Sequence, residues 1–231
     1  MGSLDSTEFP GLGDRLAEVR SGIADACRSA SRDPEDVTLI VVTKFHPAAL
    51  VAALAELGVR DVGENRHQEA QAKAEELAAL GLDWHFIGQL QTKKARQAAR
   101  YARAIHSIDR ERLVDALADV DGEIDAFVQI NLTDDPARGG VAPDGIEALA
   151  ERVLAAPALR LRGVMSVAPL EEEPARAFER LAGYADRVRA LDPEASAISA
   201  GMTHDYREAI AHGATHLRIG SAITGKRPEP R

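Results

Sequence analysis

Residues 37–63, VTLIVVTKFHPAALVAALAELGVRDVG, decide the fold of this chain. The apolar run Val37–Thr43 is typical of a strand that is buried on both faces, and Ala48–Leu57 carries apolar residues at helical spacing. Gly58 follows the helical stretch, where a left-handed C-cap is expected, and Asp61–Gly63 can form a second strand. This order of strand, helix and strand predicts a right-handed crossover between two parallel strands.

The same alternation continues to the end of the chain. The candidate strands are Val37–Thr43, Asp61–Gly63, Trp84–Ile87, Ala104–Ile108, Ala126–Ile130, Leu159–Ser166, Ala197–Ser199 and Leu217–Ile219. The candidate helices between them are Ala48–Leu57, Gln68–Leu80, Arg110–Ala118, Ile146–Leu154, Ala175–Leu191 and Tyr206–His212. About eight strands can close into a barrel, whereas a doubly wound open sheet usually has about five or six. The pattern favours a single (β/α)8 TIM barrel over the open sheet, with an extra helix at Leu12–Ala26 before it.

Composition places the chain among ordinary globular proteins. It has 231 residues, of which 45% are hydrophobic and 28% charged, and its net charge is −9. The acidic balance argues against a nucleic-acid surface, and no apolar run reaches the length of a membrane span. The single cysteine, Cys27, cannot form an internal disulfide. We expect a cytoplasmic protein with a disordered leader at 1–11, one barrel domain at 12–225 and a tail at 226–231.

A lysine stands at the end of the first strand. Functional groups collect at the carboxyl ends of barrel strands, and Lys44 ends the run that begins at Val37. An amine that loses water there becomes a nucleophile toward aldehydes. A lysine that reaches out to solvent is the alternative, and on position alone it is the stronger one.

Two segments near the C-terminus favour an anion. The residues Ser199–Thr203 follow a short strand and lead into a helix that begins near Asp205, where free N–H groups attract a phosphate. Simple N-capping by Thr203 is the alternative. Gly220 and Ser221 close the last strand, at the usual phosphate site of such barrels. A phosphate cradle near a strand-end lysine indicates a phosphorylated aldehyde, either substrate or cofactor.

Six motifs occur together and in order: VTK (42–44), GENRHQE (63–69), WHFIGQLQ (84–91), GVM (163–165), SAGMT (199–203) and RIGS (218–221). With them the chain resembles the pyridoxal phosphate homeostasis protein family from about Asp33 to Gly225. Departures from the family pattern are Gln89, Lys93 and Arg138, none of which belongs to the expected cofactor shell.

The resemblance implies a barrel of pyridoxal phosphate (PLP) fold-type III, similar to the N-terminal domain of alanine racemase. It implies a Schiff base between PLP and Lys44, and an arginine, Arg218, that faces the pyridine nitrogen. An arginine there makes the ring a weaker electron sink than an aspartate would. Further residues expected at the cofactor are Asn65 and Met165 along its ring, and Ser199, Gly201, Met202, Thr203, Gly220 and Ser221 around its phosphate.

Three functions remain open at this point. The first is a non-catalytic carrier that acts in PLP homeostasis and supplies PLP-requiring apo-enzymes. The second is an amino-acid racemase, and the third, reached without any family, is a lysine-dependent aldolase for a phosphorylated sugar. Racemases of the alanine type need a second acid/base, a tyrosine from a further C-terminal domain. This chain ends eleven residues after Gly220, and Tyr101, Tyr184 and Tyr206 lie in helical stretches. We therefore favour the carrier, as a monomer or weak dimer.

Several polar residues carry less specific signals. His85 beside Trp84 is expected to be a core histidine whose hydrogen bonds are satisfied. His204, His212 and His216 could suggest a metal, but Gly213 separates the last two, so we expect none. Glu64 next to Asn65 allows either a cofactor-network role or a structural one, and the sequence does not separate them.

Overall fold

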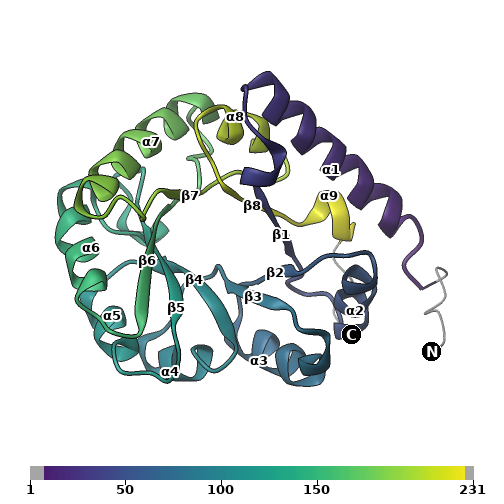
Figure 1. Cartoon of the computed structure of the whole chain (residues 1–231), viewed down its shortest axis with the longest axis horizontal. Coiled ribbons are helices and arrows are strands. Elements are labelled where there is room, and N and C mark those ends of the chain that lie inside the picture. The colour runs from purple at the N-terminus through teal and green to yellow at the C-terminus, as the bar shows by residue number, and fades with distance from the viewer. Residues whose placement is uncertain (1–7, 227–231) are drawn as a thin grey trace.

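Eight parallel strands form a closed ring in which each strand pairs with the next and β8 pairs with β1 (Figure 1). The chain is described by a computed structural model over residues 8–226. The barrel predicted from the sequence is confirmed, and an open sheet is excluded. The strands are β1 Thr38–Val42, β2 Asp61–Glu64, β3 Asp83–Phe86, β4 Ala102–Ile108, β5 Ile124–Gln129, β6 Leu159–Met165, β7 Ala197–Ser199 and β8 His216–Ile219.

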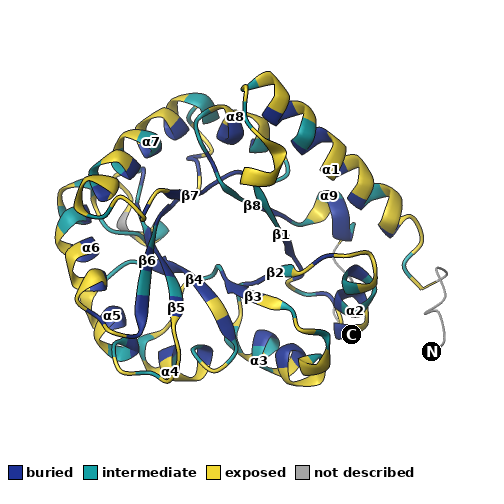
Figure 2. Ribbon diagram, viewed as in Figure 1, coloured by how far each residue is buried: buried dark blue, intermediate teal, exposed yellow. Residues whose placement is uncertain are grey.

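Helices cover the outside of the ring and turn their apolar sides toward it (Figure 2). Gly58, expected as a left-handed cap, has φ of 79°, and Gly81 and Gly213 are left-handed as well, with φ of 60° and 91°. The short helices α4 and α9 were not predicted, because one turn carries no readable periodicity. The helices are α1 Leu12–Ser29, α2 Ala48–Glu56, α3 His67–Glu76, α4 Ala95–Ala98, α5 Glu111–Leu117, α6 Ile146–Leu154, α7 Pro174–Leu191, α8 Tyr206–Ala211 and α9 Ser221–Thr224, with 3₁₀ turns at Pro34–Asp36, Ala78–Leu80, Thr92–Lys94, Pro136–Arg138 and Pro143–Gly145.

The extra helix α1 packs beside α8 and α9, on the side of the barrel where β8 and β1 close the ring of strands (Figure 1). Its apolar stripe is buried, and Cys27 within it is fully buried as a packing residue. Arg15 donates from Nε to the carbonyl of Ile223 over 2.7 Å, which ties α1 to α9. Within residues 8–226 no helix is both long and apolar enough to cross a membrane. Most of the leader expected at 1–11, and the tail beyond Lys226, lie outside the described residues.

Strand register brings the carboxyl ends of five strands to one side of the barrel opening. Val41 pairs with Ile219 of β8, and Val42 pairs with Gly63 of β2. In β7, Ser199 pairs with Met165 of β6 and with His216 of β8. The ends of β6, β7, β8, β1 and β2 therefore form a continuous arc, and loops that follow them meet there.

Candidate functional site

Every residue expected at a cofactor lies on this arc, which runs from β6 through β8 to β2. Because these strands are neighbours in the ring, residues up to 177 positions apart in the chain, from Lys44 to Ser221, reach one edge of the barrel. The residues are Lys44 after β1, Asn65 after β2, Met165 in β6, Ser199 in β7, Gly201, Met202 and Thr203 after β7, Arg218 in β8, and Gly220 and Ser221 after β8.

Lys44 lies in the turn between β1 and α2, and its side chain is exposed. Of the two environments considered for this lysine, the chain alone shows the solvent-exposed one, because the residue lies beyond the strand, at the open face of the barrel. Within residues 8–226 its amine makes no hydrogen bond or ion pair. The next residue, Phe45, has a left-handed backbone with φ of 69°, and its N–H donates to Glu69 Oε2 over 3.1 Å. The turn thus presents an unengaged primary amine.

A second lysine is buried directly behind the first. Lys73 of α3 lies 2.7 Å from Glu64 Oε1 and donates to the carbonyl of Thr43 over 3.0 Å. The hydroxyl of Thr43 donates to the same carboxylate over 2.7 Å. Burial raises the pKa of Glu64, and attraction from Lys73 opposes that shift. Glu64 thus forms an ion pair that anchors the residue before Lys44, and nothing in the sequence marked Lys73 as its partner.

Asn65 offers a buried acceptor at the same edge. Its Oδ1 has no hydrogen-bond partner within the described residues. The loop after β3 fixes its backbone: a β-carbon placed on Gly88 would lie 2.3 Å from the carbonyl oxygen of Asn65. Only glycine allows that approach, which explains a glycine inside the WHFIGQLQ motif. The orphaned amide oxygen marks a position where a polar ligand group would be accommodated.

Arg218 is a buried cation that no carboxylate among residues 8–226 contacts. Its side chain donates from Nη1 to Ser199 Oγ over 2.6 Å and from Nη2 to the carbonyl of Ser166 over 2.8 Å. Burial lowers the pKa of Arg218 to about 10, and attraction from Asp205 opposes the shift. The guanidinium therefore stays charged at neutral pH. It forms no ion pair with any residue between 8 and 226, so an electron-rich ligand atom is a favourable neighbour.

Ser199 also belongs to a line of polar side chains inside the barrel. Asp61 Oδ1 lies 2.9 Å from His85 Nε2, and His85 Nδ1 lies 2.9 Å from His106 Nε2. His106 Nδ1 in turn lies 2.8 Å from Ser199 Oγ. The prediction of a satisfied core histidine at position 85 is confirmed. Sequence reasoning missed His106, which lies on β4 among apolar residues and carries no motif of its own.

The loops after β7 and β8 form the rest of the site. Gly201 has φ of 93°, and a β-carbon there would lie 2.8 Å from that of Ala209 in α8. The N–H of Met202 donates to Asp205 Oδ1 over 2.6 Å, and Asp205 is the N-cap residue of α8. The alternative that Thr203 caps this helix is therefore wrong, and Thr203, which is half-buried, is left for another role. Ser221 is exposed and begins α9, whose first N–H groups have no partner inside the helix.

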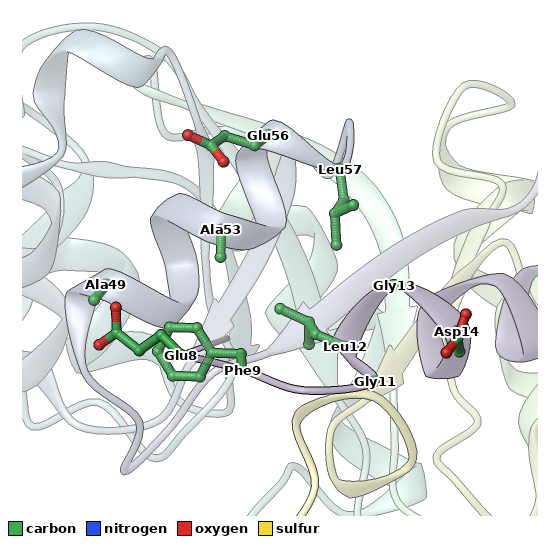
Figure 3. Close-up of a pocket in the computed structure, with 10 residues that line it drawn as sticks. All are labelled: Glu8, Phe9, Gly11, Leu12, Gly13, Asp14, Ala49, Ala53, Glu56 and Leu57. Atoms are coloured by element: carbon green, nitrogen blue, oxygen red, sulfur yellow. The ribbon is translucent and has the colours of Figure 1, made fainter. Parts of the chain in front are cut away.

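A hollow of about 330 Å³ lies apart from this arc, between the start of α1 and α2 (Figure 3). Its lining includes none of the expected cofactor residues. It is mostly apolar, with carboxylates of Glu8, Asp14 and Glu56 at its rim (Figure 3). Within the described residues no three His, Cys, Asp or Glu side chains gather as metal ligands would.

Comparison with known proteins agrees with this geometry. Residues 16–228 match the family model described as alanine racemase, N-terminal domain. The pyridoxal phosphate homeostasis protein of Mycobacterium tuberculosis is 40% identical over 235 residues, which cover 92% of this chain and 91% of that protein. The protein of the same description in Escherichia coli K12 is 37% identical over 226 residues, which cover 94% of this chain and 97% of that protein.

Solved structures of other proteins share this fold. PipY of Synechococcus elongatus, solved with PLP bound, superposes with a TM-score of 0.79 at 32% identity, covering 93% of this chain and 100% of that one. Alanine racemase of Corynebacterium glutamicum shares the fold at 17% identity and a TM-score of 0.67, with 91% of this chain covered and 60% of the racemase. The chain belongs to the pyridoxal phosphate homeostasis protein family, within the wider group that shares the alanine racemase N-terminal domain.

Proposed function

We propose that this protein binds pyridoxal 5′-phosphate on Lys44 and acts in PLP homeostasis without efficient catalysis. The observation that carries the proposal is the pairing of an exposed, unengaged Lys44 amine with a buried Arg218 guanidinium on one arc of strand ends. Membership of the homeostasis family supports it, as does a relative at 32% identity that was solved with PLP.

The residues on the arc fit this ligand. When bound, PLP supplies an aldehyde that condenses with a primary amine, together with an electron-withdrawing ring. Lys44 would hold the aldehyde carbon, while Asn65 and Met165 would line the ring. Asn65 brings an orphaned buried oxygen, and Met165 is buried in a small apolar cluster with Phe127. The phosphate would lie at the loops around Gly201, Met202, Thr203, Gly220 and Ser221, with Ser199 at the end of the neighbouring strand.

Arg218 favours storage over catalysis. Its pKa of about 10 keeps the guanidinium protonated at neutral pH, so it can donate a hydrogen bond without giving up its proton. A ring nitrogen that is not protonated withdraws electrons weakly, which limits carbanion chemistry. The same residue that orients a bound ring thus restrains its reactivity.

The tyrosines point elsewhere than the arc, which supports the carrier over the racemase. The Tyr206 hydroxyl lies against α1, where a β-carbon on Gly22 would be 2.3 Å from it. Tyr101 Oη lies 3.3 Å from His67 Nδ1, and the ring of Tyr184 lies beneath the Arg187 guanidinium. The arc as described has no phenol opposite Lys44 to act as a second acid/base.

The proposal also covers partners, location, assembly and the extent of the binding unit. PLP-requiring apo-enzymes would receive the cofactor, the protein would work in the cytoplasm, and it would do so as a monomer or weak dimer that binds no nucleic acid. The cofactor-binding unit would be residues 12–225, with 1–11 and 226–231 outside it.

Borohydride reduction of the purified protein tests the central statement. We expect a yellow protein in which reduction leaves one pyridoxyl group on Lys44, one of only five lysines in the chain. Lys44→Ala should lose the colour and stay folded, and Lys93→Ala is the matched control, since Lys93 is exposed and outside the arc. A label on another lysine with Lys44 unmodified would overturn the site. A colourless protein that takes no label from added PLP would favour the aldolase.

A further inference from the structure

A line of hydrogen bonds crosses the barrel interior from the start of β2 to the end of β8. It joins Asp61, His85, His106, Ser199 and Arg218 through contacts of 2.9, 2.9, 2.8 and 2.6 Å. The contact between His106 on β4 and Ser199 on β7 joins strands that are not neighbours in the ring, so it spans the core. The proposed function uses only the last two residues, which leaves the two histidines without a role.

If both rings are neutral, the ends of the line determine where every proton lies. A carboxylate only accepts, so His85 must donate to Asp61 from Nε2, and the bare Nδ1 of a neutral His85 must accept. His106 therefore donates from Nε2 and accepts at Nδ1, where only the Ser199 hydroxyl can supply a proton. A guanidinium only donates, so the Ser199 oxygen accepts from Arg218. With both rings neutral, each contact has one donor and one acceptor, and all of them point the same way.

The surroundings keep the His106 ring neutral and fixed. His106 is 0% exposed and stacks on Phe127 with ring centroids 4.3 Å apart at 9°. Burial holds the pKa of His106 well below its ordinary value, and His85, His216 and Arg218 push it the same way. The charged or titratable groups around the line are Asp61 from β2, Arg162 from β6, Asp205 at the N-cap of α8, and His216 with Arg218 from β8. Burial has the largest effect on His106, so a positive charge on that ring is disfavoured.

We propose that His85 and His106 are positioning residues: as neutral rings with their protons on Nε2, they orient the Ser199 hydroxyl and, through its oxygen, the Arg218 guanidinium. Ser199 then acts on Arg218 rather than on a phosphate, because its only proton is already donated to His106. Thr203 and the loop after β8 are left as the phosphate donors. That Arg218 faces the pyridine nitrogen of PLP rests on the proposed function, whereas the order of protons along the line does not.

Nitrogen NMR of the full chain with ¹⁵N-labelled histidine tests the proton order directly. We expect two neutral rings at pH 7, each with the proton on Nε2 and a bare Nδ1. Their signals are identified by their loss in His85→Gln and His106→Phe. The signal of His212, which bonds to a backbone carbonyl outside the line, should persist in both variants. A proton on Nδ1 of either ring, or a cationic ring, would overturn the proposal without any variant having to fold.

The guanidinium of Arg218 gives a second readout. In the wild type, slow rotation of the held side chain should give separate Nη signals. His106→Phe keeps the stack on Phe127 but removes the acceptor for the Ser199 hydroxyl. Ser199 then no longer orients Arg218, so the guanidinium should rotate faster and its separate Nη signals should merge. In His106→Asn the amide oxygen can replace Nδ1 as that acceptor, so the separate signals should return. Arg218 signals that stay separate in His106→Phe would contradict the role of His106. These spectra report on the chain itself. The proposed proton order can therefore fail while borohydride still fixes a pyridoxyl group on Lys44, or hold while Lys44 takes no such group.

Discussion

Lys73 lies 2.7 Å from Glu64 in a pocket closed to solvent, and both side chains contact Thr43, the residue before Lys44. Lys73→Met should lower the free energy of unfolding by about 3–5 kcal/mol, because it leaves a buried carboxylate without a partner. The double variant Lys73→Met/Glu64→Gln should recover most of that loss, since it removes the stranded charge. Urea titration measures both. Arg152→Met, which breaks an exposed pair with Asp115, is the control and should show no measurable change. An equal loss of unfolding free energy in the single and double variants would show that the loss comes from packing and not from the unpaired charge.

Thr203 and Ser199 should respond differently to two forms of the ligand. Thr203→Ala should weaken binding of pyridoxal phosphate far more than that of pyridoxal, by about ten- to a hundredfold, as expected for a hydrogen bond to a charged group. Thr203→Ser keeps the hydroxyl and should bind normally. Ser199→Ala should weaken both ligands alike, because Ser199 is engaged with His106 and Arg218. Fluorescence titration with the two ligands distinguishes these outcomes, and a phosphate-selective loss in Ser199→Ala would argue against the inferred proton order.

Gly88→Ala should disturb Asn65 without touching any ligand. The added β-carbon would meet the Asn65 carbonyl at 2.3 Å, so the loop after β2 must shift. We expect an affinity for PLP lower by about tenfold or more, the effect of losing a single well-placed contact. Gly183→Ala is the matched control: it lies in α7 with open space around its α-carbon, and it should leave affinity unchanged. Full binding by Gly88→Ala would mean that Asn65 contributes little to the site.

Acid should destabilise the fold through its buried histidines. Burial lowers the pKa of His216 to about 3, and that of His106 also falls. In the unfolded chain these histidines have their ordinary pKa of about 6.5, so they take up protons below that pH. The free energy of unfolding therefore falls as the pH drops from about 6.5 toward 3. Each histidine adds a slope of up to about 1.4 kcal/mol per pH unit. Urea titrations at several pH values should show a shallower slope for His216→Asn than for the wild type. Parallel slopes would show that His216 already carries a proton in the folded protein.

The loaded protein should not turn over free amino acids. Arg218 damps the electron sink, and the arc as described carries no phenol opposite Lys44. With L-alanine in D2O, deuterium uptake at the α-carbon, followed by NMR, should stay far below the rates of about 1–1000 per second typical of enzymes. Exchange at such rates that disappears in Lys44→Ala would restore the racemase. Spectral changes on adding an amino acid would be compatible with a carrier, since entry of the amine requires only an open site.

The fold was predictable because its signals are local. The eight strands were found within about two residues of their ends, since apolar runs closed by glycine or polar residues mark each of them. The arc of strand ends was predictable as well, because any parallel barrel brings them to one face. The site residues named from the motifs remain untested as ligands, but all of them lie on that arc.

Side-chain partners were not predictable in the same way. Lys73 and Glu64 are nine residues apart, on a helix and a strand, and only the packing of α3 against β2 brings them together. His106 and Ser199 are 93 residues apart and meet across the core. The surroundings of Lys44 were left open for a related reason: a strand-end position says where a side chain begins, not how far it reaches into solvent.

The left-handed backbone of Phe45 has a consequence for how this chain would change under selection. A β-carbon in that region costs about 1–2 kcal/mol, and the Arg66 guanidinium lies 4.8 Å from the centroid of the Phe45 ring. Glycine at position 45 would relieve the strain, but it would also remove the contact with Arg66 and free the turn that follows Lys44. Selection for a firmly held amine should therefore keep a side chain at position 45 despite its backbone strain.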